Sequence, residues 1–449
     1  MGILSGLEPK NVFEWFERIC AVPHGSGNTG AISDLCAAFA AQRGLRCVQD
    51  AVNNVVIWKD GSPGYEHAEP VILQGHLDMV CAKTADCAKD MAREPIDLRT
   101  DGAFVWADKT SLGGDDGIAV ALVLAILDDE TLPHPPIEAV FTVDEEVGMD
   151  GALALDCSVL RGRRLINIDS EDEGEFTVSC AGGVRVDSLL PAQRLPLQGG
   201  RVYAVALSGA LGGHSGVEID KGRANAAHLL ARTLFMARDA CPSLRLADVR
   251  GGQFDNVICR ACTALVAVAE DEAAALETFV GGFAATLAEE YAATEPDLTL
   301  TCTRADADTA LSEADTARLL RALFLLPQGV QEMSFDFPGL VRTSLNLGVI
   351  ALEADGLHYT CSVRSSSASQ KERLRRLLCT LAESAGGSVR TRGDYPGWAY
   401  RRESPLRELV LAAYRDLTGR EGRVSATHGG LECGLLIDKL PGLDAISLG

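Results

Sequence analysis

The strongest constraint on the fold is a repeated pattern in the first 175 residues, where short apolar segments end in acidic residues or a histidine. These runs have the length of strands, and they alternate with longer runs of helical periodicity. This alternation predicts an α/β sheet covered by helices. The pattern is carried by VILQGHLDMV at 71–80, SLGGDDG at 111–117, AVFTVDEEVG at 139–148 and LINIDSEDEGE at 165–175.

The charged ends of these segments are expected to meet. In open α/β sheets, ligands bind beyond the carboxyl ends of the strands. If these strands share one sheet, His76, Asp115, Glu146 and Asp169 converge on one crevice. Carboxylates gathered in this way repel one another, and no lysine or arginine accompanies them within the four segments. A divalent metal is therefore the natural counterion.

Each segment taken alone has a simpler interpretation. A histidine two residues before an aspartate occurs often by chance, and Asp115 after two glycines suits the N-cap of a helix. Glu145 and Glu146 fit a solvated strand end, and Asp169 begins an acidic run typical of a protein surface. The metal site is favoured because all four segments occur together in one chain.

The length of 449 residues predicts two domains. Near residue 185 the pattern changes to two rounds of strands and helices, which predict an inserted α+β domain with two similar lobes. The expected boundaries are 1–186 and 394–449 for the metal-binding domain and 187–393 for the insertion. Strands are expected at 55–58, 71–73, 137–143, 165–168, 202–207, 257–268, 344–352, 357–363 and 445–447. Helices are expected at 116–128, 222–238, 271–292, 313–325, 368–385 and 404–418, with two more within 12–44.

Composition limits the partners and the compartment. With 63 acidic and 41 basic residues, the net charge is −22, which argues against nucleic acid or an anionic membrane as a partner. The chain shows no secretory signal and no apolar run long enough to span a bilayer, so a cytoplasmic protein is expected. The 14 cysteines are expected to be reduced thiols. Cys259 and Cys262 fall in an apparent strand, where they would point to opposite faces and not form a zinc site.

Taken together, the four segments resemble the M20-clan metallopeptidases, and more narrowly the bacterial aminoacyl-histidine dipeptidases, also called peptidase D or Xaa-His dipeptidases. The resemblance covers nearly the whole chain in the same order. It implies a zinc-peptidase-type catalytic domain, with helices on both faces of a mixed sheet, and an inserted two-lobed α+β lid. Further matching segments are CAGG at 180–183, GGHSG at 212–216, SLNLG at 344–348, YPGW at 395–398 and GGLECG at 429–434.

The resemblance also implies a cofactor of two Zn²⁺ ions per subunit, with Co²⁺ or Mn²⁺ as alternatives. His76 and Asp169 would bind one ion, and Glu146 would bind the other. Asp115 would bridge both ions. The family pattern includes one more ligand, a histidine in a segment like H-S-P-D-E near the C-terminus. This sequence stops at Gly449 before such a segment, so the ion bound by Glu146 is expected to lack one protein ligand.

Three catalytic residues follow from the same resemblance. Asp78 would orient His76 and fix its tautomer. Glu145 would be the general base that takes a proton from the metal-bridging water, which leaves a bridging hydroxide to attack the substrate. His214, in the lid, would stabilise the tetrahedral oxyanion. The peptide bond between Asp115 and Asp116 would be cis.

Substrate contacts are implied for three more residues. Asn256 and Arg364 would hold the backbone or the C-terminal carboxylate of a dipeptide, a task that suits the planar guanidinium of arginine. Glu432 would bind the free amino group. Weaker candidates are Arg260, Asn346 and His428.

The expected activity is metal-dependent hydrolysis of dipeptides, with Xaa-His dipeptides as the implied type. The alternatives are an N-acyl-amino-acid amidohydrolase or a tripeptidase of the same fold, or a catalytically impaired scaffold that lacks the last metal ligand. The expected partners are a small peptide substrate and, through the lid, a second copy of the chain.

Overall fold

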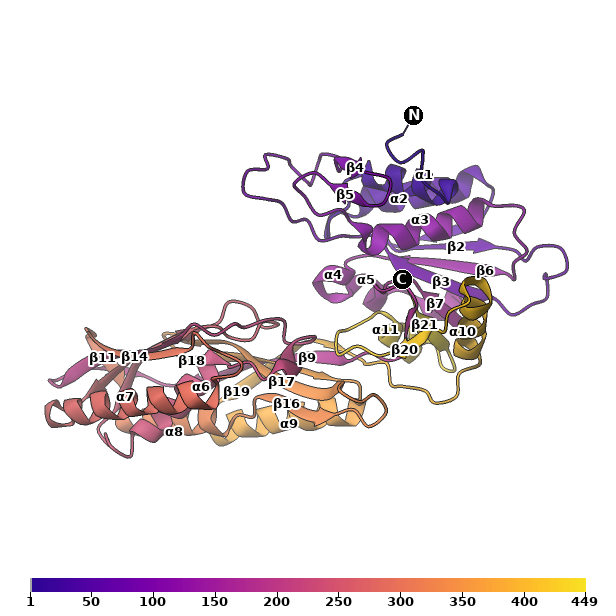
Figure 1. Ribbon diagram of the computed structural model, residues 1–449. Coiled ribbons are helices and arrows are strands. Elements are labelled where there is room, and N and C mark those ends of the chain that lie inside the picture. Colours follow the sequence, from indigo (N-terminus) through magenta and orange to yellow (C-terminus); the bar gives the residue numbers. More distant parts are fainter. Residues whose placement is uncertain (1) are drawn as a thin grey trace. The chain divides into compact units, whose positions relative to one another are not determined.

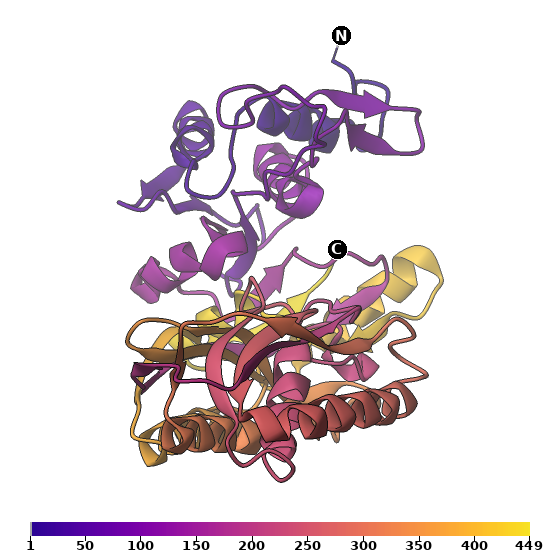
Figure 2. The same cartoon turned by 90° about the vertical axis from the view of Figure 1, so that its left-hand side faces the viewer.

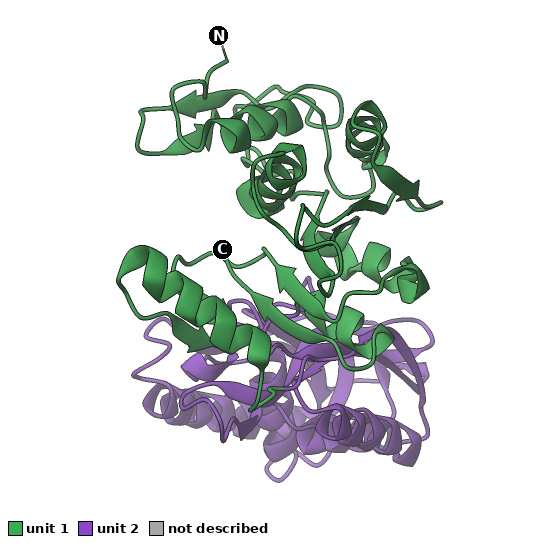
Figure 3. Ribbon diagram, turned by 90° about the vertical axis from the view of Figure 1, so that its right-hand side faces the viewer, with its two compact units in different colours: residues 1–179, 400–426, 431–449 green, residues 180–399, 427–430 purple. Residues whose placement is uncertain are grey.

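The computed structural model describes residues 2–449, which divide into two compact units (Figures 1 and 3). Unit 1 runs to Ser179 and also includes Tyr400–Ala426 and Leu431–Gly449. Unit 2 consists of Cys180–Ala399 and Thr427–Gly430. No helix among the described residues is long and apolar enough to cross a membrane.

Unit 1 is built around one mixed sheet of eight strands in the order β1-β2-β6-β3-β7-β21-β8-β20. Helices α1, α2 and α3 gather on one side of it, and α10 and α11 contact its β21 end (Figure 1). Its helices are α1 (Lys10–Cys20), α2 (Gly30–Gln42), α3 (Gly114–Asp128), α4 (Glu145–Gly148), α5 (Asp150–Ala154), α10 (Pro405–Thr418) and α11 (Cys433–Lys439). The sheet strands are β1 (Arg46–Gln49), β2 (Val55–Lys59), β3 (Val71–His76), β6 (Ile137–Thr142), β7 (Arg164–Asn167), β8 (Glu175–Thr177), β20 (Arg423–Ser425) and β21 (Asp444–Ser447), and β4 (Leu98–Thr100) pairs with β5 (Val105–Ala107) in a separate hairpin.

The three strands that carry the predicted site lie side by side and run parallel. Strand β3 pairs with β6 on one side and with β7 on the other. In this register His76 is opposite Thr142, and Gln74 is opposite Asn167. The residues that follow each strand therefore leave the sheet at the same edge, as the sequence predicts.

The core of unit 1 packs α1 and α3 against this sheet. Helix α3 is apolar on nearly all sides, and most of its side chains are buried. Phe16 and Ile19 of α1 lie against it at Gly117, where an added Cβ would be 3.2 Å from the Phe16 ring. The glycine therefore allows the two helices to approach closely, which fixes the start of α3 and the Asp115 side chain it carries.

Unit 2 contains one sheet of nine strands with four helices on one of its faces (Figure 2). Its helices are α6 (Ala226–Ala237), α7 (Ala273–Glu290), α8 (Glu313–Leu325) and α9 (Ala368–Ser384). Its strands are β9 (Gly182–Pro191), β11 (Arg201–Ser208), β12 (Arg245–Gly251), β13 (Cys262–Val268), β14 (Thr299–Ala305), β16 (Gly329–Met333), β17 (Val341–Leu352), β18 (Gly356–Ser365) and β19 (Ser388–Tyr395), and β10 (Arg194–Pro196) pairs with β15 (Thr309–Leu311).

The two predicted lobes are two halves of this one sheet. The first half runs β11-α6-β12-β13-α7-β14, and the second runs β9, then α8-β17-β18-α9-β19. Both halves have the same strand order, β14-β11-β13-β12 and β19-β9-β18-β17, and β12 and β17 join them as antiparallel neighbours. In the sequence, the whole first half therefore lies between β9, the first strand of the second half, and α8, its first helix.

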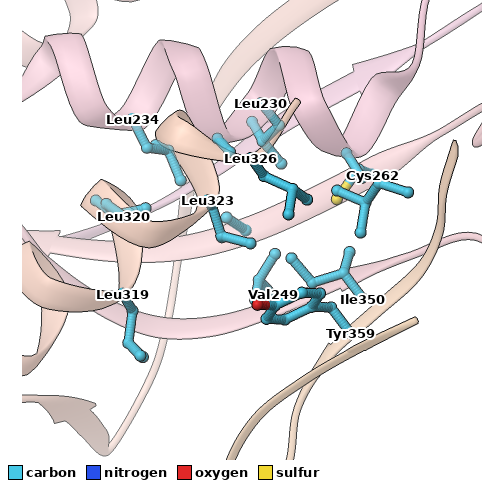
Figure 4. Close-up of a cluster of buried hydrophobic side chains, with 14 of the residues drawn as sticks. Leu230, Leu234, Val249, Cys262, Leu319, Leu320, Leu323, Leu326, Ile350 and Tyr359 are labelled. Carbon is cyan, nitrogen blue, oxygen red and sulfur yellow. The ribbon is translucent and has the colours of Figure 1, made fainter. Parts of the chain in front are cut away.

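The core of unit 2 is continuous across this junction. Figure 4 shows leucines of α6 and α8 packed over Val249 of β12, Ile350 of β17 and Tyr359 of β18. Since both halves contribute to one apolar cluster, the lobes share a single core and are not separate modules.

The domain boundaries differ from the predicted ones. Unit 2 begins at Cys180 and not at residue 187, because β9 starts at Gly182 and pairs along its length with β18 and β19. The chain returns to unit 1 at Tyr400 and not at residue 394, since Cys180 and Trp398 still form a bridge. Residues 427–430 also group with unit 2.

The predicted strand at 257–268 begins only at Cys262. Before that point the backbone bonds to a neighbouring loop instead of a strand: Ile258 N–H donates to Gly213 O at 2.9 Å, and Ser215 N–H donates to Asn256 O at 2.8 Å. Cys259 therefore lies in a loop, which corrects its predicted place in a strand. All 14 cysteines are free thiols.

Candidate metal centre and substrate-binding residues

The four predicted metal ligands come together at one edge of the unit 1 sheet. His76 ends β3, Glu146 lies in the turn after β6, and Asp169 follows β7 by two residues. Asp115 lies at the start of α3. His76 Nε2 is 2.9 Å from Asp115 Oδ1 and 3.9 Å from Asp169 Oδ1.

The side chains form two groups with the spacing of metal ligands, and both groups include His76. One consists of His76, Asp115 and Glu146, and the other of His76, Asp116 and Asp169. In each group the donor atoms lie within 4.8 Å of one another. Among the described residues, His76 is the one histidine that takes part in either group.

Asp116 is the member that sequence reasoning did not select. Its Oδ2 accepts the backbone N–H of His76 at 3.0 Å, and the side chain is buried. A Cβ at Gly75 would lie 2.6 Å from this oxygen, so the contact requires glycine in β3. The peptide bond between Asp115 and Asp116 is cis, as predicted. The sequence contains both parts of this contact, Gly75-His76 in β3 and the pair Asp115-Asp116. They are far apart in the chain, so the sequence alone does not show that they meet.

Asp78 connects the histidine to the turn that carries the two glutamates. His76 Nδ1 lies 3.0 Å from the backbone oxygen of Asp78 and 3.5 Å from its Oδ1. The same carboxylate accepts the N–H of Glu145 at 3.0 Å and the hydroxyl of Ser26 at 2.8 Å. With Nδ1 engaged on this side, Nε2 is the nitrogen that faces Asp115 and Asp169.

The site is strongly acidic and lacks a compensating cationic side chain. Within residues 2–449, no lysine or arginine forms an ion pair with these carboxylates. Burial, together with the nearby carboxylates of Asp169 and Glu432, raises the pKa of Glu145 to about 9. Burial also raises the pKa of Asp169 to about 7. Burial is the largest cause of both shifts, and a divalent cation would favour the ionised form of these carboxylates.

Glu432 belongs to a buried polar network beneath the cluster. Its Oε2 accepts from Gln74 Nε2 at 2.6 Å and from Thr142 Oγ1 at 2.5 Å. Gln74 in turn accepts from Asn167 Nδ2 at 2.6 Å, so the network joins β3, β6 and β7. Glu432 Oε1 is buried and has no hydrogen-bond partner among the described residues.

The lid residues predicted from the sequence lie in unit 2. Arg364 is in β18 and is buried with 7% of its surface exposed. Its Nη1 donates to Tyr395 Oη at 3.3 Å, and its Nε has no partner. Among residues 2–449 no carboxylate pairs with this guanidinium, so a buried cation is available to an anionic ligand.

His214 lies in the glycine-rich loop after β11. Val217 N–H donates to His214 Nδ1 at 3.3 Å, so the neutral ring carries its proton on Nε2. Burial and the nearby Arg364 lower the pKa of His214, which favours this neutral form. The loop is held by Glu218, whose Oε2 accepts the His214 N–H at 2.9 Å.

Asn256 lies in the loop between β12 and β13, beside the His214 loop. Asn346 of β17 positions it indirectly, because Asn346 Nδ2 donates to the backbone oxygens of Asp255 and Val257 at 3.2 and 2.9 Å. Asn346 is thus engaged within the protein. Arg260 is exposed, and its Nε donates to Ala210 O at 3.4 Å.

Comparisons with known proteins show similarity to peptidases. The chain is 37% identical to the cytosol non-specific dipeptidase of Escherichia coli K12 over 452 residues, covering 100% of this chain and 93% of that protein. The crystal structure of aminoacylhistidine dipeptidase from Vibrio alginolyticus matches with a TM-score of 0.89 and 34% identity, covering 99% of this chain and 91% of that one. Residues 205–295 match the M20 peptidase dimerisation domain.

A more distant likeness concerns the fold alone. The aminopeptidase PepT of Bacillus cereus matches with a TM-score of 0.53 and 14% identity, covering 98% of this chain and 90% of that one. With 37% identity along its whole length, the chain belongs to the M20-clan metallopeptidases, in the family of the aminoacylhistidine and cytosol non-specific dipeptidases.

Proposed function

We propose that this protein is a metal-dependent dipeptidase that hydrolyses unblocked dipeptides, including those with a C-terminal histidine. One observation carries the proposal: two groups of potential metal ligands share His76, and Glu145 is adjacent in sequence to the ligand candidate Glu146 without belonging to either group. A carboxylate beside the ligands is what a general base requires.

We propose that two divalent cations, most simply Zn²⁺, bind here, with Co²⁺ and Mn²⁺ as alternatives. His76 and Asp169 would hold one cation, Glu146 would hold the other, and Asp115 would contact both. The donor set of one imidazole and several carboxylates suits such ions, and the raised pKa values of the buried carboxylates support the binding of cations that favour their ionised form. When bound, the metals polarise the peptide carbonyl and acidify the attacking water.

Glu145 takes the proton of the attacking water and later returns one to the leaving amine. Burial favours its protonated form, so bound cations are needed to keep it ionised and basic. His214 donates its Nε2–H to the developing oxyanion. A neutral imidazole with the proton fixed on Nε2 is suited to this task.

Recognition of the two ends of a short peptide is assigned to separate groups. Arg364 and Asn256 bind the C-terminal carboxylate and the backbone, and Arg364 is supported by its burial without an acidic partner. Glu432 binds the free amino group through Oε1, its unpartnered oxygen. A requirement for both charges would limit the substrates to very short unblocked peptides.

The test is a substrate panel with the purified, zinc-loaded protein. Alanyl-histidine, alanyl-alanine, a tripeptide and N-acetyl-alanine are compared by kcat/KM. Hydrolysis of both dipeptides with little turnover of the other two is expected. Turnover of N-acetyl-alanine alone would replace the proposal with an amidohydrolase, and preference for the tripeptide would make it a tripeptidase. No turnover with metal bound would identify a catalytically impaired scaffold.

We further propose that the protein is cytoplasmic and forms a homodimer through unit 2, where the dimerisation domain matches. One edge of the matched segment, β12, is already paired with β17 in the same chain. The sheet ends at β14 (Thr299–Ala305), an edge strand just outside the matched segment that pairs with its strand β11, and this edge is proposed for pairing between subunits. Light scattering after size exclusion should give twice the mass of the chain, and a monomeric mass would exclude the dimer.

A further inference from the structure

The Arg364 guanidinium is surrounded by fixed polar groups on the unit 2 sheet. In the strand register, Arg364 of β18 lies opposite Ser344 of β17 on one side and opposite Gly183 of β9 on the other. Both neighbours are small, so the long side chain is not crowded by its cross-strand partners. Space beside the guanidinium is therefore open to groups from other segments.

Tyr395 supplies the first of these groups. Its Oη accepts from Arg364 Nη1 at 3.3 Å, and the side chain is buried. Tyr395 is also the register partner of Gly183, where an added Cβ would lie 2.7 Å from the tyrosine Oη. Glycine at position 183 therefore leaves the space that the phenol ring fills next to the guanidinium.

The second group is a buried pair formed by Ser344 and His428. Ser344 Oγ lies 2.8 Å from His428 Nε2, and each residue is at most 4% exposed. Burial and the nearby Arg364 together lower the pKa of His428 to about 3. The ring is therefore neutral and adds no positive charge that would repel the guanidinium.

On a third side, the His214 loop approaches the guanidinium of Arg364 at Gly216, a residue without a side chain. A Cβ at Gly216 would lie 2.8 Å from His214 Cε1 and 3.4 Å from Arg364 Cζ. A second donor nitrogen, Arg364 Nε, is buried and has no partner among residues 2–449. The cluster thus surrounds the guanidinium while leaving this donor unused.

We propose that Tyr395 and the Ser344–His428 pair are positioning residues that hold Arg364 ready to bind the terminal carboxylate of the substrate. The inference rests on the proposed function, in which Arg364 binds that carboxylate. It gives a role to the tyrosine of the YPGW segment and to His428, neither of which the proposed chemistry uses. A guanidinium fixed in advance loses less freedom when it binds an anion.

The experiment compares Tyr395→Phe and Ser344→Ala with Tyr359→Phe as the matched control. Like Tyr395, Tyr359 is a buried tyrosine of the same sheet. It lies in β18, five residues from Arg364, or roughly 16 Å along the strand. Kinetics are measured with a dipeptide and with its C-terminal amide. Each cluster variant is expected to raise KM for the dipeptide roughly three- to tenfold, with kcat little changed. This is the size of effect expected for the loss of one hydrogen bond. Turnover of the amide should be unaffected.

Arg364→Lys separates this inference from the function on which it rests. Arg364→Lys should raise KM more than either cluster variant, and adding Tyr395→Phe to it should have no further effect. An unchanged KM in Arg364→Lys would overturn the carboxylate role itself. If Arg364→Lys raises KM but both cluster variants behave like Tyr359→Phe, only the positioning role is overturned. Independent, multiplicative effects in the double variant would also overturn it.

Discussion

The carboxylate of Asp78 accepts the backbone N–H of Glu145, with Asp78 Oδ1 3.0 Å from the amide nitrogen. The same oxygen lies 3.5 Å from His76 Nδ1. One side chain thus fixes the imidazole of a proposed metal ligand and also the first residue of α4, the proposed base. The position of the base and the orientation of the ligand are therefore coupled through Asp78.

This coupling predicts a double defect in Asp78→Ala. Because His76 Nδ1 loses the carboxylate at 3.5 Å but keeps the backbone oxygen of residue 78 at 3.0 Å, zinc affinity should fall roughly 10-fold. Because the start of α4 loses its acceptor, kcat at saturating zinc should fall as well. Zinc affinity is measured by competition with a chelating dye and kcat by a dipeptide assay. Ser26→Ala, which removes only one hydrogen bond to Asp78, should have a much smaller effect on both. Normal kcat in zinc-saturated Asp78→Ala would contradict the coupling.

Glu145 and Glu146 are adjacent in sequence but are expected to respond differently to removal of their charge. Glu145→Gln should lower kcat by roughly 10²- to 10⁴-fold, the usual contribution of a general base, while the zinc content stays the same. Glu146→Gln should instead lower the zinc content, because Glu146 belongs to a ligand group and Glu145 does not. Elemental analysis and steady-state kinetics on both variants test the assignment. Zinc loss in Glu145→Gln would reverse the two roles.

Much of unit 1 and its acidic site could be predicted because the signals are local. The apolar runs at 71–73 and 137–143 predict strands, and parallel strands direct the residues that follow them to one edge. The acidic ends of these runs could then be brought together by topology alone. The prediction needed no side-chain detail, because metal ligands are recognised by residue type.

Other features depend on contacts between distant segments, which periodicity does not reveal. Asp116 holds the His76 backbone only because Gly75 lacks a side chain. The predicted strand at 257–268 was too long because its first residues bond to the His214 loop. The short strand β12 has no strong apolar run, so the junction that joins the two lobes into one sheet could not be predicted.

Glu432 offers a test of how the protein recognises a free amino group. Its Oε2 is engaged by Gln74 and Thr142, which leaves Oε1 for the ammonium of a substrate. Glu432→Gln keeps the shape but removes the charge, so kcat/KM for an unblocked dipeptide should fall roughly 10- to 100-fold, as expected for the loss of a charged hydrogen bond. The slow turnover of an N-acetyl dipeptide should not change. An equal loss with both substrates would assign Glu432 a structural role.

The acidic cluster should also make the metal-free protein sensitive to alkaline pH. The folded-state pKa of Glu145 is raised from 4.5 to about 9, and that of Asp169 from 3.8 to about 7. Between the unfolded and the folded value, the folded state binds more protons than the unfolded state, so stability is lost as pH rises through this window. The slope for each group is at most about 1.4 kcal/mol per pH unit.

Thermal unfolding of the chelator-treated protein should therefore give a lower Tm at about pH 8.5 than at about pH 6. Glu145→Gln should flatten this dependence, because it removes a carboxyl group with a strongly raised pKa while leaving the other 62 acidic residues in place. Added zinc should raise Tm more at the higher pH, since it binds the ionised carboxylates and opposes their repulsion. If Tm of the metal-free protein rises with pH, or if Glu145→Gln leaves the dependence unchanged, uncompensated charge at this cluster does not limit stability.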